Sequence, residues 1–231
     1  MPARCPAAAP VAQDEPMDRM AWRLGATGPV QQSPVTCGSA ALTVARMLAD
    51  PAFARWMVAG VARDGGRPDG RTEQARFAEY ERVVMGRTNA LVGPGNRLQL
   101  PWPRALGTAP WGARRELEHG ASAPGTRYRL RVLRFASAAT LAATYRRLVH
   151  LVQEGRPALL YVGNAVAPRH VTLVLPGDGD TVLDVYDPAT GTVMSLDEGR
   201  YMTRRLALAG WDVPWVLVQP ARSEPAGRFS P

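Results

Sequence analysis

The sequence predicts an α+β protein in which helices come first along the chain and an antiparallel sheet follows. Apolar residues recur at helical spacing through the first half of the body. The second half contains short β-branched runs separated by Gly, Pro and Asp, as an antiparallel sheet requires. With 231 residues, 46% of them hydrophobic, the chain is long enough for one substantial core or two lobes that share an interface.

We expect one domain over residues 21–220, between a disordered lead at residues 1–20 and a flexible tail at residues 221–231. The lead, MPARCPAAAPVAQDEP, lacks the hydrophobic middle of a secretory signal. No stretch of the chain approaches the apolar length of a membrane helix. These features predict a cytoplasmic protein without a membrane partner, although leaderless export would leave the same sequence.

Five helices are expected, and the first begins at the run CGSAALTVARML. The others are predicted at residues 51–61, 72–85, 113–119 and 138–153. A Gly/Pro-rich stretch, GPGNRLQLPWPRALGTAPWG, is interpreted as a long ordered loop with Trp102 and Trp111. These tryptophans either line a substrate cleft or, as we favour, anchor the loop to the core.

Strands are expected at residues 127–134 and in the runs RPALLYVGN, RHVTLVLP, TVLDVYDP, TVMSLD and DVPWVLVQP. Together with the preceding helices they define an α+β arrangement. Helices and sheet would then form two lobes with a cleft between them.

The formal net charge of +8 comes from 28 basic residues, all of them Arg. A GC-rich coding sequence produces this bias without functional demand, so no nucleic-acid partner is predicted. Residues 101–150 nevertheless contain nine Arg against two Glu, and Arg127, Arg129 and Arg131 alternate so that they share one face of a strand. We interpret this face as solvated surface, with an acidic partner as the alternative.

The two cysteines, Cys5 and Cys37, do not make a disulfide framework. The three histidines, His119, His150 and His170, have no metal-ligand spacing. We therefore expect no cofactor and no metal.

Cys37 is the candidate nucleophile, in the run QQSPVTCGSAAL. Either Ser33 followed by Pro34, or Thr36 alone, can begin the helix, and both choices place Cys37 in its first turn. The free backbone N–H groups and the positive end of the helix dipole favour the reactive thiolate there. A small buried cysteine on an amphipathic helix is the structural alternative.

Two neighbours favour the functional interpretation of Cys37. Gly38 removes side-chain bulk beside the sulfur, so a substrate backbone is expected to approach there. Gln31 lies six residues upstream. Its amide, with the backbone N–H of Cys37, can donate to an oxyanion, and such donors are typically worth about 3 kcal/mol each.

His170 begins one predicted strand and Asp187 ends the next. If Asp178 and Gly179 form a two-residue type I′ loop between them, His170 falls directly opposite Asp187. Opposed residues share a face with Cβ atoms roughly 5 Å apart, which suits a carboxylate that orients an imidazole.

The base and its partner have alternative roles and alternative candidates. Asp187 also opens the turn Asp-Pro-Ala-Thr-Gly, a role compatible with orienting His170. Asp184 is the weaker carboxylate because it should point to the opposite face. His119 and His150 are expected to face solvent.

Gln31, Cys37-Gly38 and the later His170 and Asp187-Pro188-x-x-Gly191 together resemble the papain-like cysteine peptidases, in particular the bacterial branch that processes double-glycine leaders of bacteriocins. The match covers roughly residues 28–50 and 156–220. It implies that Cys37 is the nucleophile, His170 the base, Asp187 the third member and Gln31 the oxyanion-hole residue. Thr36 departs from the acidic residue often found before the nucleophile in that branch.

The resemblance implies a helical lobe with the nucleophile, a sheet with His and Asp, and hydrolysis of a peptide or protein substrate through a thioester. A deamidase, a transglutaminase-like enzyme or a peptide-cyclising enzyme would use the same residues. A non-catalytic binding module that presents the Arg face is the third possibility.

Overall fold

The computed structural model describes residues 26–62, 66–179 and 181–221, and these form the predicted α+β fold. The helices are α1 (Cys37–Ala49), α2 (Pro51–Ala59), α3 (Glu73–Asn89), α4 (Pro110–His119), α5 (Ala138–Leu151) and α6 (Glu198–Met202). The strands are β1 (Val92–Gly93), β2 (Arg97–Leu98), β3 (Tyr128–Val132), β4 (Ala158–Gly163), β5 (Pro168–Pro176), β6 (Leu183–Asp187), β7 (Thr192–Leu196) and β8 (Val213–Pro220). Short 3-10 turns lie at Pro94–Asn96 and Arg104–Leu106.

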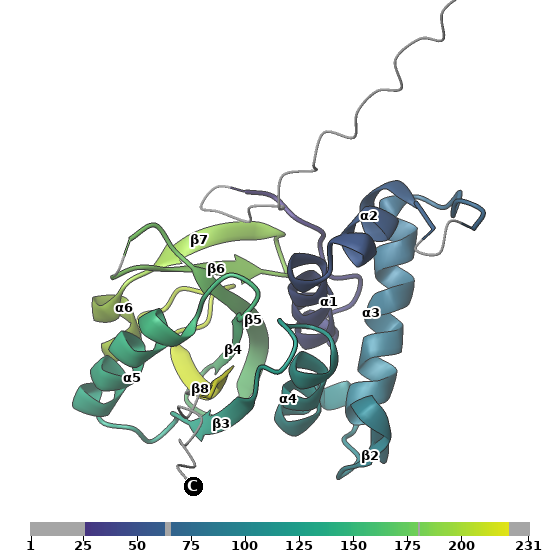
Figure 1. Ribbon diagram of the computed structural model, residues 1–231. Helices are drawn as coiled ribbons and strands as arrows, with labels where there is room; N and C mark the ends of the chain where they lie inside the picture. The colour runs from purple at the N-terminus through teal and green to yellow at the C-terminus, as the bar shows by residue number, and fades with distance from the viewer. Residues whose placement is uncertain (1–25, 63–65, 180, 222–231) are drawn as a thin grey trace, which may run out of the picture.

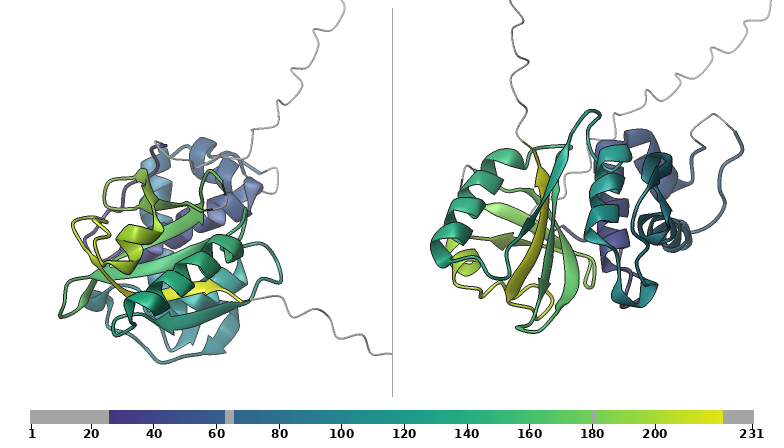
Figure 2. Two further views of the ribbon diagram at one scale, coloured as in Figure 1. Left: turned by 90° about the vertical axis from the view of Figure 1, so that its left-hand side faces the viewer. Right: turned by 90° about the horizontal axis from the view of Figure 1, so that it is seen from below.

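The main sheet has six antiparallel strands in the order β3-β8-β4-β5-β6-β7. Helices α1 to α4 lie on one side of this sheet, and α5 and α6 lie on the other (Figure 1). The view from below separates these layers, with α5 and α1 on opposite faces of the sheet (Figure 2). The fold therefore has a helical lobe and a sheet lobe, in the chain order that was predicted.

Helix boundaries follow local capping residues. Asp50 accepts the N–H of Phe53 at the start of α2, and Pro51 occupies the first helical position. Gly60 ends this helix in the left-handed conformation, with φ of 72°. Thr72 and Ser137 cap α3 and α5 in the same manner as Asp50.

Two apolar clusters hold the layers together. One joins α1 to the inner face of the sheet, and α1 is buried on nearly every side, as expected for a helix between two layers. The other packs α5 and α6 on the outer face, where the rings of Tyr145 and Tyr201 lie 5.5 Å apart. The first cluster includes Cys37, so packing rather than a loop holds the candidate nucleophile in place.

The predicted hairpin between β5 and β6 was wrong in its register. Leu173 pairs with Tyr186 and Pro176 with Leu183, so residues 177–182 form the connection instead of two residues. A type I′ turn needs positive φ at both central residues. Gly179 has φ of 88°, but Asp178 is not in the positive-φ region. The register is therefore shifted by two residues, which preserves the face that each side chain occupies.

The long loop is ordered by its own side chains. The indole rings of Trp102 and Trp111 meet edge to face at 5.0 Å. Trp111 Nε1 donates to the carbonyl of Leu100 at 2.8 Å, and Trp102 Nε1 lies 3.4 Å from that of Leu106. These contacts join the loop to itself and to the start of α4, and neither tryptophan packs on the two apolar clusters, so the expected anchoring to the core is not what they provide.

Several smaller features differ from the sequence-based expectation. Helix α4 begins three residues earlier than predicted, α3 ends four residues later, and the short elements β1, β2 and α6 were not anticipated. The predicted lead at residues 1–20 lies outside the described residues, as does the predicted tail beyond residue 221. Within the described ranges, no helix combines the length and apolarity needed to span a bilayer.

Candidate active site

His170 and Asp187 meet at the end of the sheet where β5 begins and β6 ends. His170 Nε2 lies 2.7 Å from Asp187 Oδ1, and both side chains are buried, with exposed fractions of 6% and 1%. The two residues are not directly opposed, because the register differs by two from the predicted one. Since a two-residue shift keeps both side chains on one face, the predicted contact still forms.

A tight turn after β6 holds the carboxylate of Asp187. Its Oδ1 also accepts the N–H of Ala189 at 2.9 Å, and its backbone carbonyl accepts the N–H of Gly191 at 2.8 Å. Gly191 has φ of 72°, and a Cβ there would lie 2.4 Å from the carbonyl oxygen of Gly28. The turn predicted from Asp-Pro-Ala-Thr-Gly is thus present, and glycine is needed at its end.

The segment at residues 26–31, here called the strap, runs beside this turn and leads to Gln31. The N–H of Gly28 donates to the carbonyl of Gly191 at 2.6 Å, and the N–H of Gln31 donates to that of Pro188 at 2.8 Å. The Tyr186 hydroxyl donates to the strap carbonyl of Pro29. These hydrogen bonds join two segments that are far apart in sequence, and they fix the position of Gln31 relative to the turn that follows Asp187.

Cys37 is the first residue of α1, and its exposed fraction is 4%. It lies close enough to His170 for its sulfur to raise the pKa of the imidazole. Because Nε2 of the imidazole is bonded to Asp187, Nδ1 is the nitrogen left for the sulfur. The structure thus brings Cys37, His170 and Asp187 into one continuous chain of contacts.

The imidazole of His170 is held in its protonated form. Burial acts to lower its pKa, but the hydrogen bonds to Asp187 and Cys37, together with their negative charges, outweigh burial and raise the pKa to about 9. An imidazolium beside the sulfur stabilises a thiolate, the nucleophilic form of cysteine.

The start of α1 supplies donors for a second negative charge. Backbone N–H groups in the first turn of a helix, including that of Cys37, have no acceptor inside the helix. Thr36 occupies the N-cap position without a side-chain cap, and its hydroxyl donates to the carbonyl of Ser33 at 2.8 Å. These N–H groups and the positive end of the helix dipole favour an anion at this point.

Gln31 lies at the end of the strap, directly before the turn that precedes α1. Its Nε2 donates to the carbonyl of Ser33 at 2.8 Å, and its Oε1 is buried without a partner among the described residues. One of the two amide hydrogens is thus engaged with the loop that leads to Cys37. The second is the one that an oxyanion would use.

The expectation for Gly38 needs correction. A Cβ at Gly38 would lie 2.7 Å from Thr108 Cβ, so the space beside this glycine is filled by the loop before α4. The Thr108 hydroxyl also hydrogen-bonds Ser39 Oγ at 3.0 Å. Glycine is required here for close packing of α1 against that loop, and not to admit a substrate backbone.

Glu81 is a buried carboxylate beside the strap that sequence reasoning missed. The N–H of Gln32 lies 3.3 and 3.2 Å from its two oxygens, and its exposed fraction is 1%. Burial raises its pKa, against the hydrogen bond from the N–H of Gln32. A signal was present, because Glu81 falls on the helical stripe that includes Phe77 and Val84.

Tyr161 on β4 is the second missed neighbour. Its hydroxyl donates to the carbonyl of Thr108 at 3.1 Å, and burial, followed by the nearby Cys37, raises its pKa well above the usual value. Nothing distinguished it within the apolar run RPALLYVGN. Its side chain lies near Cys37 on the side of the sheet.

The remaining candidates lie elsewhere. His119 and His150 are exposed, in agreement with their prediction, and Asp184 is buried at a distance of three residues from Asp187 along β6. Across residues 26–62, 66–179 and 181–221, no three His, Cys, Asp or Glu side chains gather as ligands for a metal ion.

Fold and site together define an α+β protein with a buried Cys–His–Asp arrangement at the junction of two lobes. No family model matches the sequence, and no curated protein matches it. Among solved structures, the chain is similar to the crystal structure of the Pseudomonas avirulence protein AvrPphB, with 16% identity, 84% of this chain and 97% of that chain covered, and a TM-score of 0.44.

Proposed function

We propose that the protein is a papain-like cysteine peptidase with Cys37 as nucleophile, His170 as acid and base, Asp187 as the group that orients the imidazole, and Gln31 as an oxyanion donor. One observation supports this most strongly. A cysteine at the first position of a helix contacts a histidine whose other ring nitrogen lies 2.7 Å from a buried carboxylate. A core cysteine without catalytic use has no need of this set of partners.

The first half of the reaction forms a thioester. The Cys37 thiolate attacks the peptide carbonyl carbon, and the carbonyl electron pair moves to the oxygen. The backbone N–H of Cys37 and the free amide hydrogen of Gln31 donate to that oxyanion. The His170 imidazolium then gives its proton to the departing nitrogen as the C–N bond breaks.

The second half releases the acid. His170, now neutral, removes a proton from water, and the hydroxide oxygen attacks the thioester carbon. The C–S bond breaks, and the thiolate and imidazolium are restored together. Asp187 stabilises the imidazolium and fixes its ring orientation in both halves. No cofactor takes part in these steps.

The substrate is proposed to be a peptide or protein, and the double-glycine-leader branch is the closest functional analogy from the sequence. Deamidation, transamidation and peptide cyclisation share the thioester and differ only in the donor or the acceptor. Incubation with a peptide library followed by mass spectrometry separates these reactions. Cleavage products identify a peptidase, a gain of about one dalton identifies a deamidase, and loss of ammonia with joining identifies a transamidase.

The proposal is tested by alkylation with iodoacetamide near pH 6. This small reagent suits a sulfur whose residue is only 4% exposed. We expect a single rapid modification at Cys37, lost in Cys37→Ala and strongly slowed in His170→Ala, with His150→Ala as the matched control because His150 is exposed on α5. Labelling no faster than that of a free thiol would refute the activated pair and favour a binding module.

A further inference from the structure

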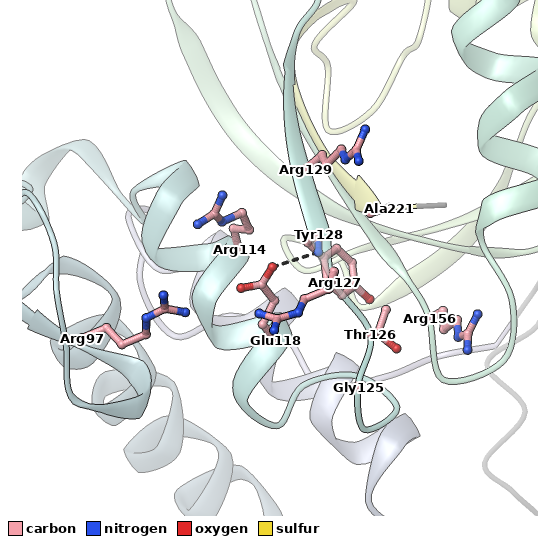
Figure 3. A pocket seen from close by; sticks show the side chains of 10 residues that line it. All are labelled: Arg97, Arg114, Glu118, Gly125, Thr126, Arg127, Tyr128, Arg129, Arg156 and Ala221. Carbon is pink, nitrogen blue, oxygen red and sulfur yellow. Dashed lines mark hydrogen bonds between the residues drawn. The ribbon is translucent and has the colours of Figure 1, made fainter. Parts of the chain in front are cut away.

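A strongly basic pocket is lined by residues of α4 and β3. Its volume is about 550 Å³, and five arginines line it against one carboxylate, that of Glu118 (Figure 3). The arginines come from four places in the fold: Arg97 from β2, Arg114 from α4, Arg127 and Arg129 from the residue before β3 and from β3 itself, and Arg156 from the turn before β4.

The positive charge of this pocket is not neutralised by the described part of the protein. None of the five arginines forms an ion pair with a described residue. Glu118 is occupied, because its Oε1 accepts the N–H of Tyr128 at 2.9 Å. Arg114 is half-buried, and its Nε has no hydrogen-bond partner among the described residues. Guanidinium groups brought together in this way repel each other unless an anion lies between them.

The basic lining continues past this pocket. A neighbouring pocket of about 320 Å³ shares Arg129 and Ala221 with it and adds Arg131 and Arg147. The alternating arginines that were interpreted as solvated surface therefore line two connected hollows, together with arginines from α4, β2 and α5 that the strand pattern could not have indicated.

The lining suits oxyanions, and phosphate offers several oxygens together with more than one negative charge. Guanidinium groups present paired N–H donors that match two oxygens of one phosphate, and several such groups match several phosphates. The lining offers no stacking surface for nucleic-acid bases, because its one aromatic residue, Tyr128, is 3% exposed. The pocket volume suits a small molecule.

We propose that this pocket binds a small molecule with two or more phosphate groups. The half-buried Arg114 and Arg156 and the exposed Arg97, Arg127 and Arg129 supply its donors. The proposal is independent of the peptidase function and concerns a separate site.

Helix α4 shows how the two sites are separated. It begins beside the nucleophile, where Thr108 packs on Gly38, and Glu118 near its other end lines the pocket. Cys37, His170 and Asp187 are not among the residues that line the pocket.

The test is thermal unfolding of the full chain with inorganic tripolyphosphate, compared with sulfate at equal ionic strength. A ligand at about 100 times its dissociation constant should raise the midpoint by roughly 5–10 °C for a domain of this size. We expect Arg114→Gln and Arg156→Gln each to weaken the apparent affinity about tenfold or more. Arg55→Gln, exposed on α2 outside the pocket, should leave it unchanged.

Two further arms identify the source of the phosphates. Sedimentation with phosphatidylcholine vesicles that contain phosphatidylinositol bisphosphate, lost in Arg114→Gln, would place a lipid headgroup in the site, whereas stabilisation by tripolyphosphate alone would indicate a free ligand. Three outcomes would overturn the proposal. Sulfate could stabilise the protein as much as tripolyphosphate does, or Arg55→Gln could lose as much affinity for tripolyphosphate as the pocket variants. A single-stranded oligonucleotide could also bind more tightly than tripolyphosphate.

Discussion

Replacement of Asp187 by Asn tests the central contact of the site. The substitution keeps the shape of the side chain and removes its charge, 2.7 Å from His170 Nε2. A hydrogen bond to a charged group is worth about 1.5–3 kcal/mol, and one pKa unit corresponds to about 1.4 kcal/mol. The pKa of His170, which is about 9 in the intact site, should therefore fall by roughly 1–2 units in Asp187→Asn.

The sign of the effect on the reaction follows from the proton that His170 must give to the leaving nitrogen. The imidazolium is present below its pKa and is lost as the pH rises through that value. For a fall of about 1.5 units, the protonated fraction at pH 8 decreases roughly fourfold. The alkaline limit of peptide cleavage should move to lower pH by the same amount.

The assay is an NMR titration of the imidazole nitrogens, with the pH profile of cleavage as the second measurement. Asp178→Asn provides the matched control, because Asp178 is an exposed residue of the same hairpin. An unchanged or higher pKa of His170 in Asp187→Asn would show that the carboxylate does not stabilise the imidazolium, and the proposed role of Asp187 would be wrong.

Two further predictions concern the strap. Burial raises the pKa of Glu81 above its unfolded value, so its contribution to stability is present at low pH and is lost as the carboxyl ionises. In urea unfolding, the free energy of unfolding of Glu81→Gln should therefore rise relative to that of the native protein between about pH 4 and pH 7. A difference in free energy that does not change with pH would contradict this. Gly191→Ala should destabilise the protein by about 1–3 kcal/mol, because φ is 72° there and the new Cβ would lie 2.4 Å from the carbonyl oxygen of Gly28. Gly179→Ala is the control and should cost only about 1 kcal/mol, because φ is 88° but the space around it is open. Equal thermal midpoints for the two variants would refute the close approach at Gly191.

The contact between His170 and Asp187 was predictable although the turn that suggested it was wrong. Asp178-Gly179 was assigned to a two-residue turn, and the actual connection spans residues 177–182. In an antiparallel pair, an even shift in register leaves each side chain on its face, and only an odd shift reverses it. Residues of β5 and β6 are buried on both faces of the sheet, so the apolar pattern alone does not select the face. The expected turn had the right parity and the wrong length, so it predicted the face but not how far along the strands the partners lie.

The start of α1 was predictable for a different reason. Pro34, Thr36 and the run of small apolar residues after Cys37 are local signals, and local signals determine where a helix begins. The surroundings of Gly38 were not predictable, because Thr108 lies 70 residues away in a loop whose path depends on α4. Sequence patterns therefore located the nucleophile but not what packs against it.

Glu81 and the basic pocket show the same limit. A carboxylate on an apolar helical stripe is visible in the sequence, yet its partner, the N–H of Gln32, belongs to a segment 49 residues away. The alternating arginines of β3 likewise predict a basic face, but a pocket requires Arg97, Arg114 and Arg156 from three other segments. A strand face alone meets water and favours the solvated interpretation. A group of charged residues forms a binding site only where the tertiary fold places several unneutralised side chains around one pocket. Each added guanidinium increases the electrostatic repulsion in the empty pocket, and a bound anion relieves this repulsion.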